Sequence, residues 1–397
     1  MLGGAAALDR FKTPIAKMSE LAADRDLPPS AGIKLFLAGD VMLGRGIDQV
    51  LPHPSDPSIY EPYMVSAEGY VALAESAHGP IPKPVDYSYV WGDALAALRQ
   101  AQPDARIVNL ETSITKSMRY ARKEIHYRMN PENAACLTAA GIDCCALANN
   151  HVLDWGPAGL LETLETLAQA GIRGVGAGRN AAEASAPAIL SANGKGRIVV
   201  FSFGTEDSGI PGEWAAGASE PGVNLLQDFS DRTLARVAAL AQAARRPGDI
   251  LVASMHWGAN FGYAIPSEHK KFAHGLIEGG SFDVVFGHSS HHPLGIEVYQ
   301  RKLILYGCGD FLNDYEGIGG YEEYRGDLTL MYLPVFSAST GDLLQLTMRP
   351  FQIRRFRLNS AAEEDARWLS QRLDRESARL GTRVRLASDG SLVASWA

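Results

Sequence analysis

Carboxylate, amide and imidazole side chains follow short apolar runs at separate points of the sequence. Asp40 comes after the run 33–38, Glu111 after 105–110, and His256 after 250–255. Oxygen atoms and neutral imidazoles of this kind bind a divalent cation when a rigid scaffold holds them together. The sequence therefore predicts a divalent-cation site, for which the candidate ligands are Asp40, Glu111, Asn150, His256 and His291.

Histidines near carboxylates predict proton transfer at the same place. His151 lies three residues before Asp154, and either His288 or His291 would meet an acidic side chain across the same edge. A carboxylate orients an imidazole and raises its basicity. Two such pairs on opposite faces of a Cα atom would take a proton and return it, as epimerisation requires. In the alternative interpretation Asp154 only tethers the loop that carries His151. The candidate catalytic residues are His151, Asp154, His288, His291 and Asp310.

Four further residues are candidates for binding the substrate. The planar guanidinium of Arg45 would hold a carboxylate or phosphate through two hydrogen bonds, or it would form a structural ion pair instead. Trp91, Trp257 and Tyr263 flank the polar motifs and would line a pocket for an aromatic or peptide substrate. The alternative for each of these three rings is packing in the core.

The elements that must position these residues alternate between strand and helix. Buried strands are predicted at 33–38, 105–110, 144–148, 250–255, 283–286 and 303–306. Amphipathic helices are predicted at 91–100, 157–170, 230–244 and 266–278. This order indicates an α/β fold, in which ligands gather at the carboxyl ends of the strands. Strand ends far apart in the sequence are therefore expected to meet at one site.

The flanking segments complete the predicted organisation. Residues 1–31 are expected to be a weakly structured lead-in with one short helix, followed by a single domain over 32–397. The segment 51–90, rich in proline and tyrosine, predicts a long ordered surface loop rather than a packed helix. From about residue 336 we expect a β/α extension. It comprises β-structure at 343–348 and 352–358, a helix at 361–380 and a closing strand at 383–396.

Composition argues against several classes of partner. The chain has 397 residues, of which 46% are hydrophobic, and its formal net charge is −8. A negative chain offers no basic field for a phosphate backbone, so nucleic acid is not expected as a partner. The glycines at 174, 176 and 178 do not complete a dinucleotide-binding pattern, because Ala181 stands where the third glycine belongs. We therefore expect no nucleotide cofactor.

The cysteines and the first residues predict the compartment. The four cysteines have no paired metal-binding spacing, and Cys144 and Cys145 adjoin in an apolar run, which predicts reduced thiols in the core. The first 35 residues contain neither the apolar stretch of a signal peptide nor a membrane span. These features predict a cytoplasmic protein that has no membrane partner.

Four motifs occur in an order that resembles a known family. They are GDVMLGRG from residue 39, NLET from 109, ANNHVLD from 148 and GHSSHH from 287. Over about 33–335 they resemble the bacterial capsule-synthesis CapA/PgsA family, a branch of the calcineurin-like metallophosphatases. The resemblance implies a sandwich of two stacked mixed β-sheets flanked by helices, with the site on one rim. It also implies metal positions at Asp40, Glu111, Asn150 and His256, a catalytic role for His151, and closing paired histidines at His288 and His291.

The chain departs from the superfamily pattern at several positions. Phosphatases of this superfamily usually begin with Asp, any residue, His, whereas this chain has Met42 in the third place, so one ligand of the first metal is missing. The second carboxylate is Glu111 instead of Asp, two serines separate the closing histidines, and Asp310 stands where CapA relatives commonly have Asn. Two-metal catalysis requires ions about 3.5 to 4 Å apart. We therefore expect one hard divalent cation, Ca²⁺, Mg²⁺ or Mn²⁺.

Three functional hypotheses are compatible with these residues. The first, which we prefer, is a metal-dependent enzyme that epimerises a residue at Cα in a ribosomally made lasso-peptide precursor, because a soluble branch of this fold is similar in modifying such peptides. The second is poly-γ-glutamate capsule biosynthesis, as an enzyme or a non-catalytic accessory protein. The third is a metallophosphoesterase. The expected partner is a peptide or polyglutamyl substrate.

Overall fold

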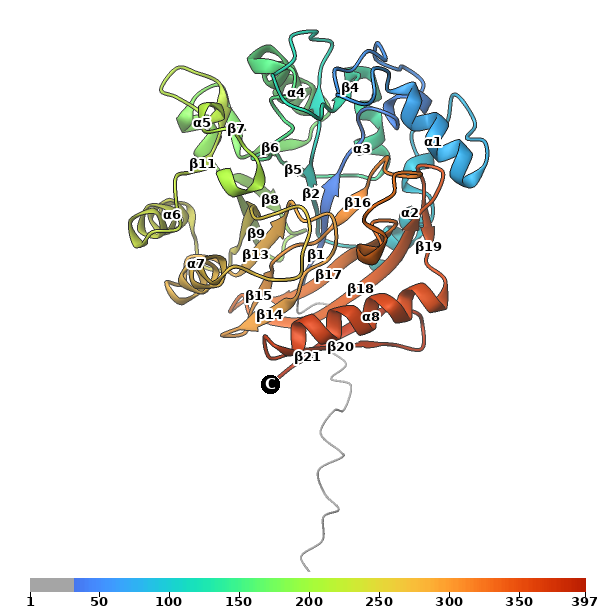
Figure 1. Ribbon diagram of the computed structural model, residues 1–397. Coiled ribbons are helices and arrows are strands. Elements are labelled where there is room, and N and C mark those ends of the chain that lie inside the picture. The colour runs from blue at the N-terminus through green and yellow to red at the C-terminus, as the bar shows by residue number, and fades with distance from the viewer. Residues whose placement is uncertain (1–31) are drawn as a thin grey trace, which may run out of the picture. The chain divides into compact units, whose positions relative to one another are not determined.

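Two mixed β-sheets lie face to face and form the centre of the structure (Figure 1). The structure is a computed structural model that describes residues 32–397, so the predicted lead-in at 1–31 lies outside the described residues. The predicted α/β sandwich of two stacked mixed sheets flanked by helices is confirmed. None of the helices within residues 32–397 has the length and apolar character needed to cross a membrane.

The larger sheet has parallel strands on one side and antiparallel strands on the other. Its main path runs through β20 (Thr382–Leu386), β21 (Leu392–Trp396), β18 (Leu343–Ile353), β17 (Leu328–Ser337), β1 (Gly32–Val41), β2 (Ala105–Leu110), β5 (Cys144–Ala146) and β6 (Arg173–Val175). Neighbours from β1 to β6 run parallel, and those from β1 to β20 run antiparallel. The short β16 (Asp310–Leu312) pairs in parallel with the end of β1. Strands buried on both faces explain why β1, β2 and β5 are continuous apolar runs.

The smaller sheet has a parallel centre. Its path runs through β11 (Leu225–Leu226), β9 (Arg197–Thr205), β12 (Ile250–His256), β13 (Val284–His288), β15 (Lys302–Leu305) and β14 (Ile296–Tyr299), and β8 (Ala188–Ser191) pairs with β9. The neighbours from β11 to β15 are parallel. The carboxyl ends of β12 and β13 therefore lie side by side, with His256 paired in register with His288.

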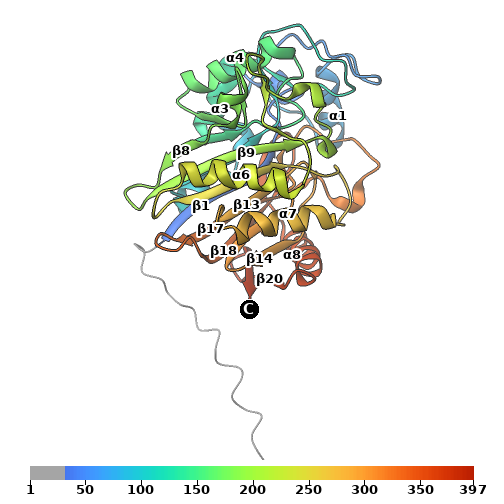
Figure 2. The ribbon, with the colours of Figure 1, turned by 90° about the vertical axis from the view of Figure 1, so that its left-hand side faces the viewer.

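Three apolar layers hold the sandwich together. Leu37 of β1 and Val252 of β12 belong to the cluster between the two sheets. The outer face of the larger sheet packs against α2 (Ala94–Ala101), α3 (Ala135–Ala139) and α4 (Gly156–Gln169). The outer face of the smaller sheet packs against α6 (Asp231–Ala244) and α7 (Ser267–Glu278), which Figure 2 shows in front of the sheet. All four cysteines are buried and free, as predicted.

Several predicted elements need correction. The segment 51–90 contains the helix α1 (Glu68–His78), whose Tyr70, Val71 and Ala74 are buried, so the prediction of a loop without a packed helix was wrong. The segment 383–396 is not one strand but the hairpin of β20 and β21.

Between β18 and β19 (Leu358–Ser360) the chain turns through Arg355 and Phe356 with φ values of 57° and 53°, which interrupts the predicted β-structure at 352–358. The helix α8 (Glu363–Ala378) agrees with the expected amphipathic helix at 361–380.

Candidate active site

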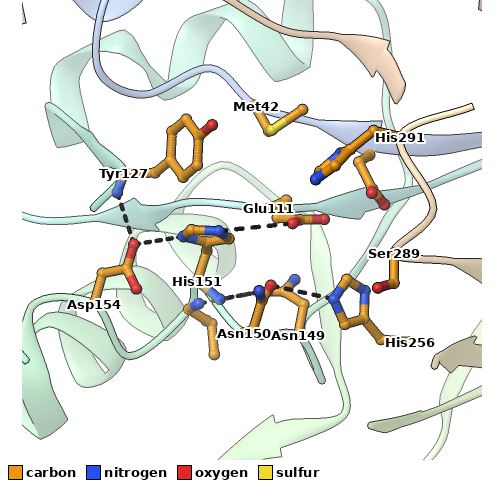
Figure 3. A network of polar contacts seen from close by, with 12 residues as sticks. Met42, Glu111, Tyr127, Asn149, Asn150, His151, Asp154, His256, Ser289 and His291 are labelled. Carbon is orange, nitrogen blue, oxygen red and sulfur yellow. Dashed lines mark hydrogen bonds and ion pairs between the residues drawn. The ribbon is translucent and has the colours of Figure 1, made fainter. Parts of the chain in front are cut away.

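The predicted polar strand ends converge on one edge of the sandwich. Ligand atoms of Asp40, His256 and His288 lie within 4.8 Å of one another, and so do those of Asp40, His291 and Asp310. Asn150 Oδ1 lies 3.2 Å from His256 Nε2 (Figure 3). The parallel strands of both sheets thus bring these side chains together from distant parts of the sequence.

The first group surrounds two neighbouring carboxylates. Asp40 and Asp310 are partners in register on the parallel strands β1 and β16. A Cβ atom at Gly39 would lie 1.8 Å from the Gly309 carbonyl oxygen, so only glycine allows β1 to approach this turn. His291 Nδ1 lies 2.8 Å from Asp310 Oδ1. This arrangement places an imidazole and two carboxylates around one point.

The second group contains two imidazoles from adjacent strands. His256 Nδ1 lies 2.8 Å from His288 Nδ1, and His288 Nε2 lies 2.6 Å from Ser254 Oγ. His288 Nδ1 is 3.9 Å from Asp40 Oδ1. His288 is therefore surrounded by candidate ligands instead of being paired with a separate carboxylate, so the geometry favours cation binding over proton exchange for this residue.

Two asparagines that the sequence analysis missed connect the ligands. Asn109 Nδ2 donates to Asp40 Oδ1 at 2.8 Å and to Glu111 Oε2 at 2.9 Å. The Oδ1 atom of Asn109 accepts a hydrogen bond from Asn149 Nδ2. Asn149 Oδ1 in turn accepts the backbone N–H of His151. Each asparagine lies within two residues of a candidate site residue, and this proximity in the sequence could have identified it.

Burial and mutual charge shift the pKa values of the ionisable groups in the cluster. Burial first, and then the neighbouring Asp310 charge, raise the pKa of Asp40 to about 7. Burial and Asp40 raise the pKa of Glu111 well above its usual value. Although burial lowers the pKa of His291, the charges of Asp310 and Asp40 raise it overall. Asp40 Oδ2 is buried and has no hydrogen-bond partner within residues 32–397. Acidic oxygens and imidazoles in this state suit a divalent cation.

The predicted pair of His151 and Asp154 is present. His151 Nδ1 lies 2.7 Å from Asp154 Oδ2, and His151 Nε2 lies 3.9 Å from Glu111 Oε1 (Figure 3). Asp154 also accepts the Tyr127 N–H and faces Lys123 Nζ at 2.8 Å. Asp154 therefore both orients the imidazole and tethers its surroundings. Burial is the largest influence on His151 and lowers its pKa to about 4, which leaves the ring neutral at pH 7.

The two serines between the closing histidines form a tight turn. Ser289 has φ of 99°, a conformation that non-glycine residues rarely adopt, and its Oγ donates to the Gly258 carbonyl oxygen. This turn returns His291 to the rim beside Asp310. His292 instead lies beside Tyr263 and accepts the Gly262 N–H, outside the ligand groups. Of the three histidines in the GHSSHH motif, His288 and His291 therefore face the site.

Arg45 does not provide the predicted anion anchor. Its guanidinium is buried and binds Asp314 through Nε at 2.9 Å and through Nη2 at 2.5 Å, and it binds Glu61 through Nη1 at 3.1 Å. The Tyr70 ring covers the same group, 3.6 Å away. Two acidic partners already use its donors, so the structure favours the alternative of an internal ion pair.

The aromatic candidates separate into core and rim. Trp91 is fully buried and donates to the Cys136 carbonyl oxygen, so it packs in the core and does not line a pocket. Trp257 is 3% exposed and stacks on the His269 ring, but it also lines a small cavity together with Phe261, so its role in binding a substrate stays a prediction. Tyr263 is partly exposed but lies against His292 and beneath the Arg372 guanidinium.

The rim has aromatic residues that were not predicted. Tyr60 stacks on Tyr120 with ring centroids 3.9 Å apart, and Phe261 stacks on Tyr321 at the same distance. Tyr60, Tyr120 and Tyr321 are exposed. Phe261 lies 5.6 Å from the His291 ring, which places one of these stacks beside the candidate metal ligands. Tyr60 lies in the tyrosine-rich segment 51–90, and the other three rings lie outside the quoted motifs.

Residues 34–315 match the family model described as bacterial capsule synthesis protein PGA_cap. The chain belongs to this family. That membership confirms the resemblance to capsule-synthesis proteins that the four motifs predicted.

Named relatives of this chain agree with the family assignment. A probable polyglutamine synthesis accessory protein from Mycobacterium tuberculosis is 48% identical over 362 residues, which cover 91% of this chain and 95% of the relative. The PGA biosynthesis protein CapA of Bacillus subtilis is 27% identical over 280 residues, covering 70% and 62% of the two chains. Among solved structures, a phosphatase from Mycoplasma pneumoniae aligns with a TM-score of 0.44 at 12% identity, over 81% of this chain and 94% of that one.

Proposed function

We propose that this protein is a divalent-cation-dependent hydrolase that cleaves a polyglutamyl chain as an accessory step of capsule polymer synthesis. The observation that carries the proposal is the buried cluster of carboxylates and imidazoles around Asp40, with His151 beside it. The polymer is inferred from the relatives, whose names refer to polyglutamine synthesis and to PGA and capsule biosynthesis.

The arrangement of His151 supports hydrolysis. Asp40, His256, His288, His291 and Asp310 would hold a divalent cation, which would supply Lewis-acid polarisation of a carbonyl group. The hydrogen bond to Asp154 leaves His151 Nε2 facing Glu111 and the site. Neutral His151 accepts a proton from the attacking water and passes it to the departing nitrogen as the C–N bond breaks. The products are a carboxylic acid and an amine, so atoms and charge balance.

Manganese is the cation that the donors favour among the three predicted ions. Carboxylate oxygens come from Asp40 and Asp310, whereas His256, His288 and His291 add imidazole nitrogen. Oxygen-only sites suit Ca²⁺ and Mg²⁺, and imidazole suits transition metals. A mixed set of buried donors therefore supports Mn²⁺.

A basic loop beside His151 supports an acidic substrate. Lys123 Nζ binds the Asn150 carbonyl oxygen and lies 3.3 Å from His151 Nδ1, which fixes the loop 116–123 next to the site. Arg119 and Arg122 in this loop are exposed and form no ion pair with any residue of 32–397. On a chain with a net charge of −8, unpaired cations here would attract the side-chain carboxylates of polyglutamate.

The test is a chain-length assay with purified protein. Poly-γ-glutamate, poly-α-glutamate and neutral polyglutamine are incubated with protein and Mn²⁺, and products are sized by chromatography. We expect the wild-type protein to shorten a glutamyl polymer. A chelator should abolish this activity and Mn²⁺ should restore it, whereas the His151→Asn variant should not shorten the polymer. Intact polymers together with release of p-nitrophenol from simple phosphate esters would instead establish a phosphoesterase and refute the proposal.

Epimerisation is a second candidate, because two histidine–carboxylate pairs reach the same cluster. His151 pairs with Asp154 and His291 with Asp310, at 2.7 and 2.8 Å. Such pairs would exchange a proton on opposite faces of a Cα atom, in a lasso-peptide precursor or in a glutamyl chain. Incubation of the peptide in D₂O discriminates the two candidates. Epimerisation places one deuterium at a single Cα, and hydrolysis leaves Cα unlabelled.

A further inference from the structure

Met42 occupies the place at which the superfamily pattern has a metal-binding histidine. The residue is buried, and its side chain lies between the Tyr127 ring and His291 (Figure 3). Its Sδ accepts a hydrogen bond from the Tyr315 hydroxyl at 3.4 Å. A thioether is a poor ligand for a hard cation. Because Met42 cannot bind a hard cation well, the first cation position lacks one ligand.

Asp310 lies where it can replace that ligand. Its strand β16 runs parallel to β1 and places Asp310 opposite Asp40 in register. The connecting Gly309 has φ of 74°, and the Asp40 N–H donates to its carbonyl oxygen at 3.1 Å. Both carboxylates are buried, at 0% and 3% exposure. Two buried carboxylates side by side are stabilised either by a shared proton or by a positive group between them.

Distances in this group agree with shared coordination. His291 Nδ1 lies 2.8 Å from Asp310 Oδ1, and the ligand atoms of Asp40, His291 and Asp310 all lie within 4.8 Å of one another. Two donors about 2.1 Å from one ion and at right angles would be about 3 Å apart. Asn313 Nδ2 donates to Asp310 Oδ2 at 2.7 Å and fixes the carboxylate. The Oδ2 atom of Asp40 is buried without a partner among residues 32–397.

We propose that Asp310 supplies the ligand that Met42 cannot, and that the protein consequently binds two divalent cations. The first position is formed by Asp40, His291 and Asp310, and the second by Asp40, His256 and His288, with Asp40 shared. This inference rests on the cation dependence proposed above and replaces the single cation expected from the sequence. The competing interpretation is that Asp310 only orients His291 through a hydrogen bond.

Cation stoichiometry distinguishes the two interpretations. Metal-free protein is titrated with Mn²⁺ by calorimetry, and bound manganese is counted after gel filtration. We expect two ions per wild-type chain and one per D310N chain. Asparagine keeps the Oδ1 acceptor for His291, so a purely orienting Asp310 would leave two ions in D310N and overturn the proposal. The double variant M42H/D310N should regain the second ion, because histidine at 42 restores the donor.

Controls keep the result interpretable. D48N changes a buried aspartate that binds the backbone N–H groups of Ser55 and Asn130 elsewhere, and it should retain two ions. Should D310N fail to fold in a thermal melt, electron paramagnetic resonance of the wild type decides. An exchange-coupled manganese pair supports the proposal, and one isolated ion at saturation overturns it. No bound ion at all would refute the cation dependence as well, whereas one ion in both proteins refutes only the assignment of Asp310.

Discussion

Two histidine–aspartate pairs of nearly equal length lie in contrasting surroundings. Asp154, the partner of His151, also accepts the Tyr127 N–H and faces Lys123, so its charge is balanced locally. Asp310, the partner of His291, instead faces a second buried carboxylate at Asp40. The difference teaches that a histidine–aspartate pair does not define a role. The surroundings of the His151–Asp154 pair favour proton transfer, and those of the His291–Asp310 pair favour cation binding.

The sharpest way to test this comparison is to remove the proton-handling imidazole. His151→Asn should lower kcat of the chain-length assay by about 10²–10⁴-fold, the usual contribution of an acid–base group. Manganese affinity should stay within a few-fold of wild type, because His151 is outside both ligand groups. Kinetics and calorimetry measure the two quantities. If His151→Asn lost manganese affinity as well as kcat, the two histidine–aspartate pairs would have the same role.

A milder change acts mainly on the candidate cation ligands. Asn109 Nδ2 binds both Asp40 and Glu111, so Asn109→Ala frees two candidate ligands without removing either. Partners that orient metal ligands are typically worth about 10–100-fold in metal affinity. We expect a loss of manganese affinity in that range by calorimetry, while the His151 and Asp154 pair remains intact. Unchanged affinity would show that the ligands do not depend on this asparagine.

The pH dependence should also differ between the two pairs. Burial and Asp310 raise the pKa of Asp40 to about 7, and a cation must displace that proton. Manganese affinity should therefore fall as pH decreases from 8 to 6, by about tenfold over the whole window for one displaced proton with a pKa of about 7. Calorimetry in buffers of different ionisation enthalpy would count the released protons. An affinity independent of pH would contradict the raised pKa.

The raised pKa of Asp40 also affects the stability of the metal-free protein, which should fall as pH rises, whereas manganese affinity should increase. A carboxyl group with a raised pKa in the folded state contributes stability that is fully present below its unfolded pKa, near 4, and that is lost as pH rises through 7. The melting temperature of metal-free protein should therefore fall over this window relative to Asp40→Asn. Manganese should remove the difference near pH 8, because the cation then compensates the charge.

The fold and the ligand cluster were largely predictable, because apolar runs that end in Asp40, Glu111 and His256 carry a local pattern. Parallel strands then require such ends to meet. What the sequence could not supply were contacts made by residues distant in the chain. Arg45 pairs with Asp314, 269 positions away, and that contact removes it from the site. Helix α1 was missed because the flanking prolines dominated the pattern of its segment.

The smallest expected effect concerns substrate charge. Arg119→Glu with Arg122→Glu reverses the exposed charges of the loop that Lys123 fixes beside His151. Lost attraction for a polyanion should raise KM by about 3- to 10-fold at low salt and much less at high salt, with kcat preserved. The matched control is Arg236→Glu with Arg385→Glu, two exposed arginines outside the site whose reversal changes net charge equally. An equal rise of KM in both double variants would mean that overall charge, and not this loop, attracts the polymer.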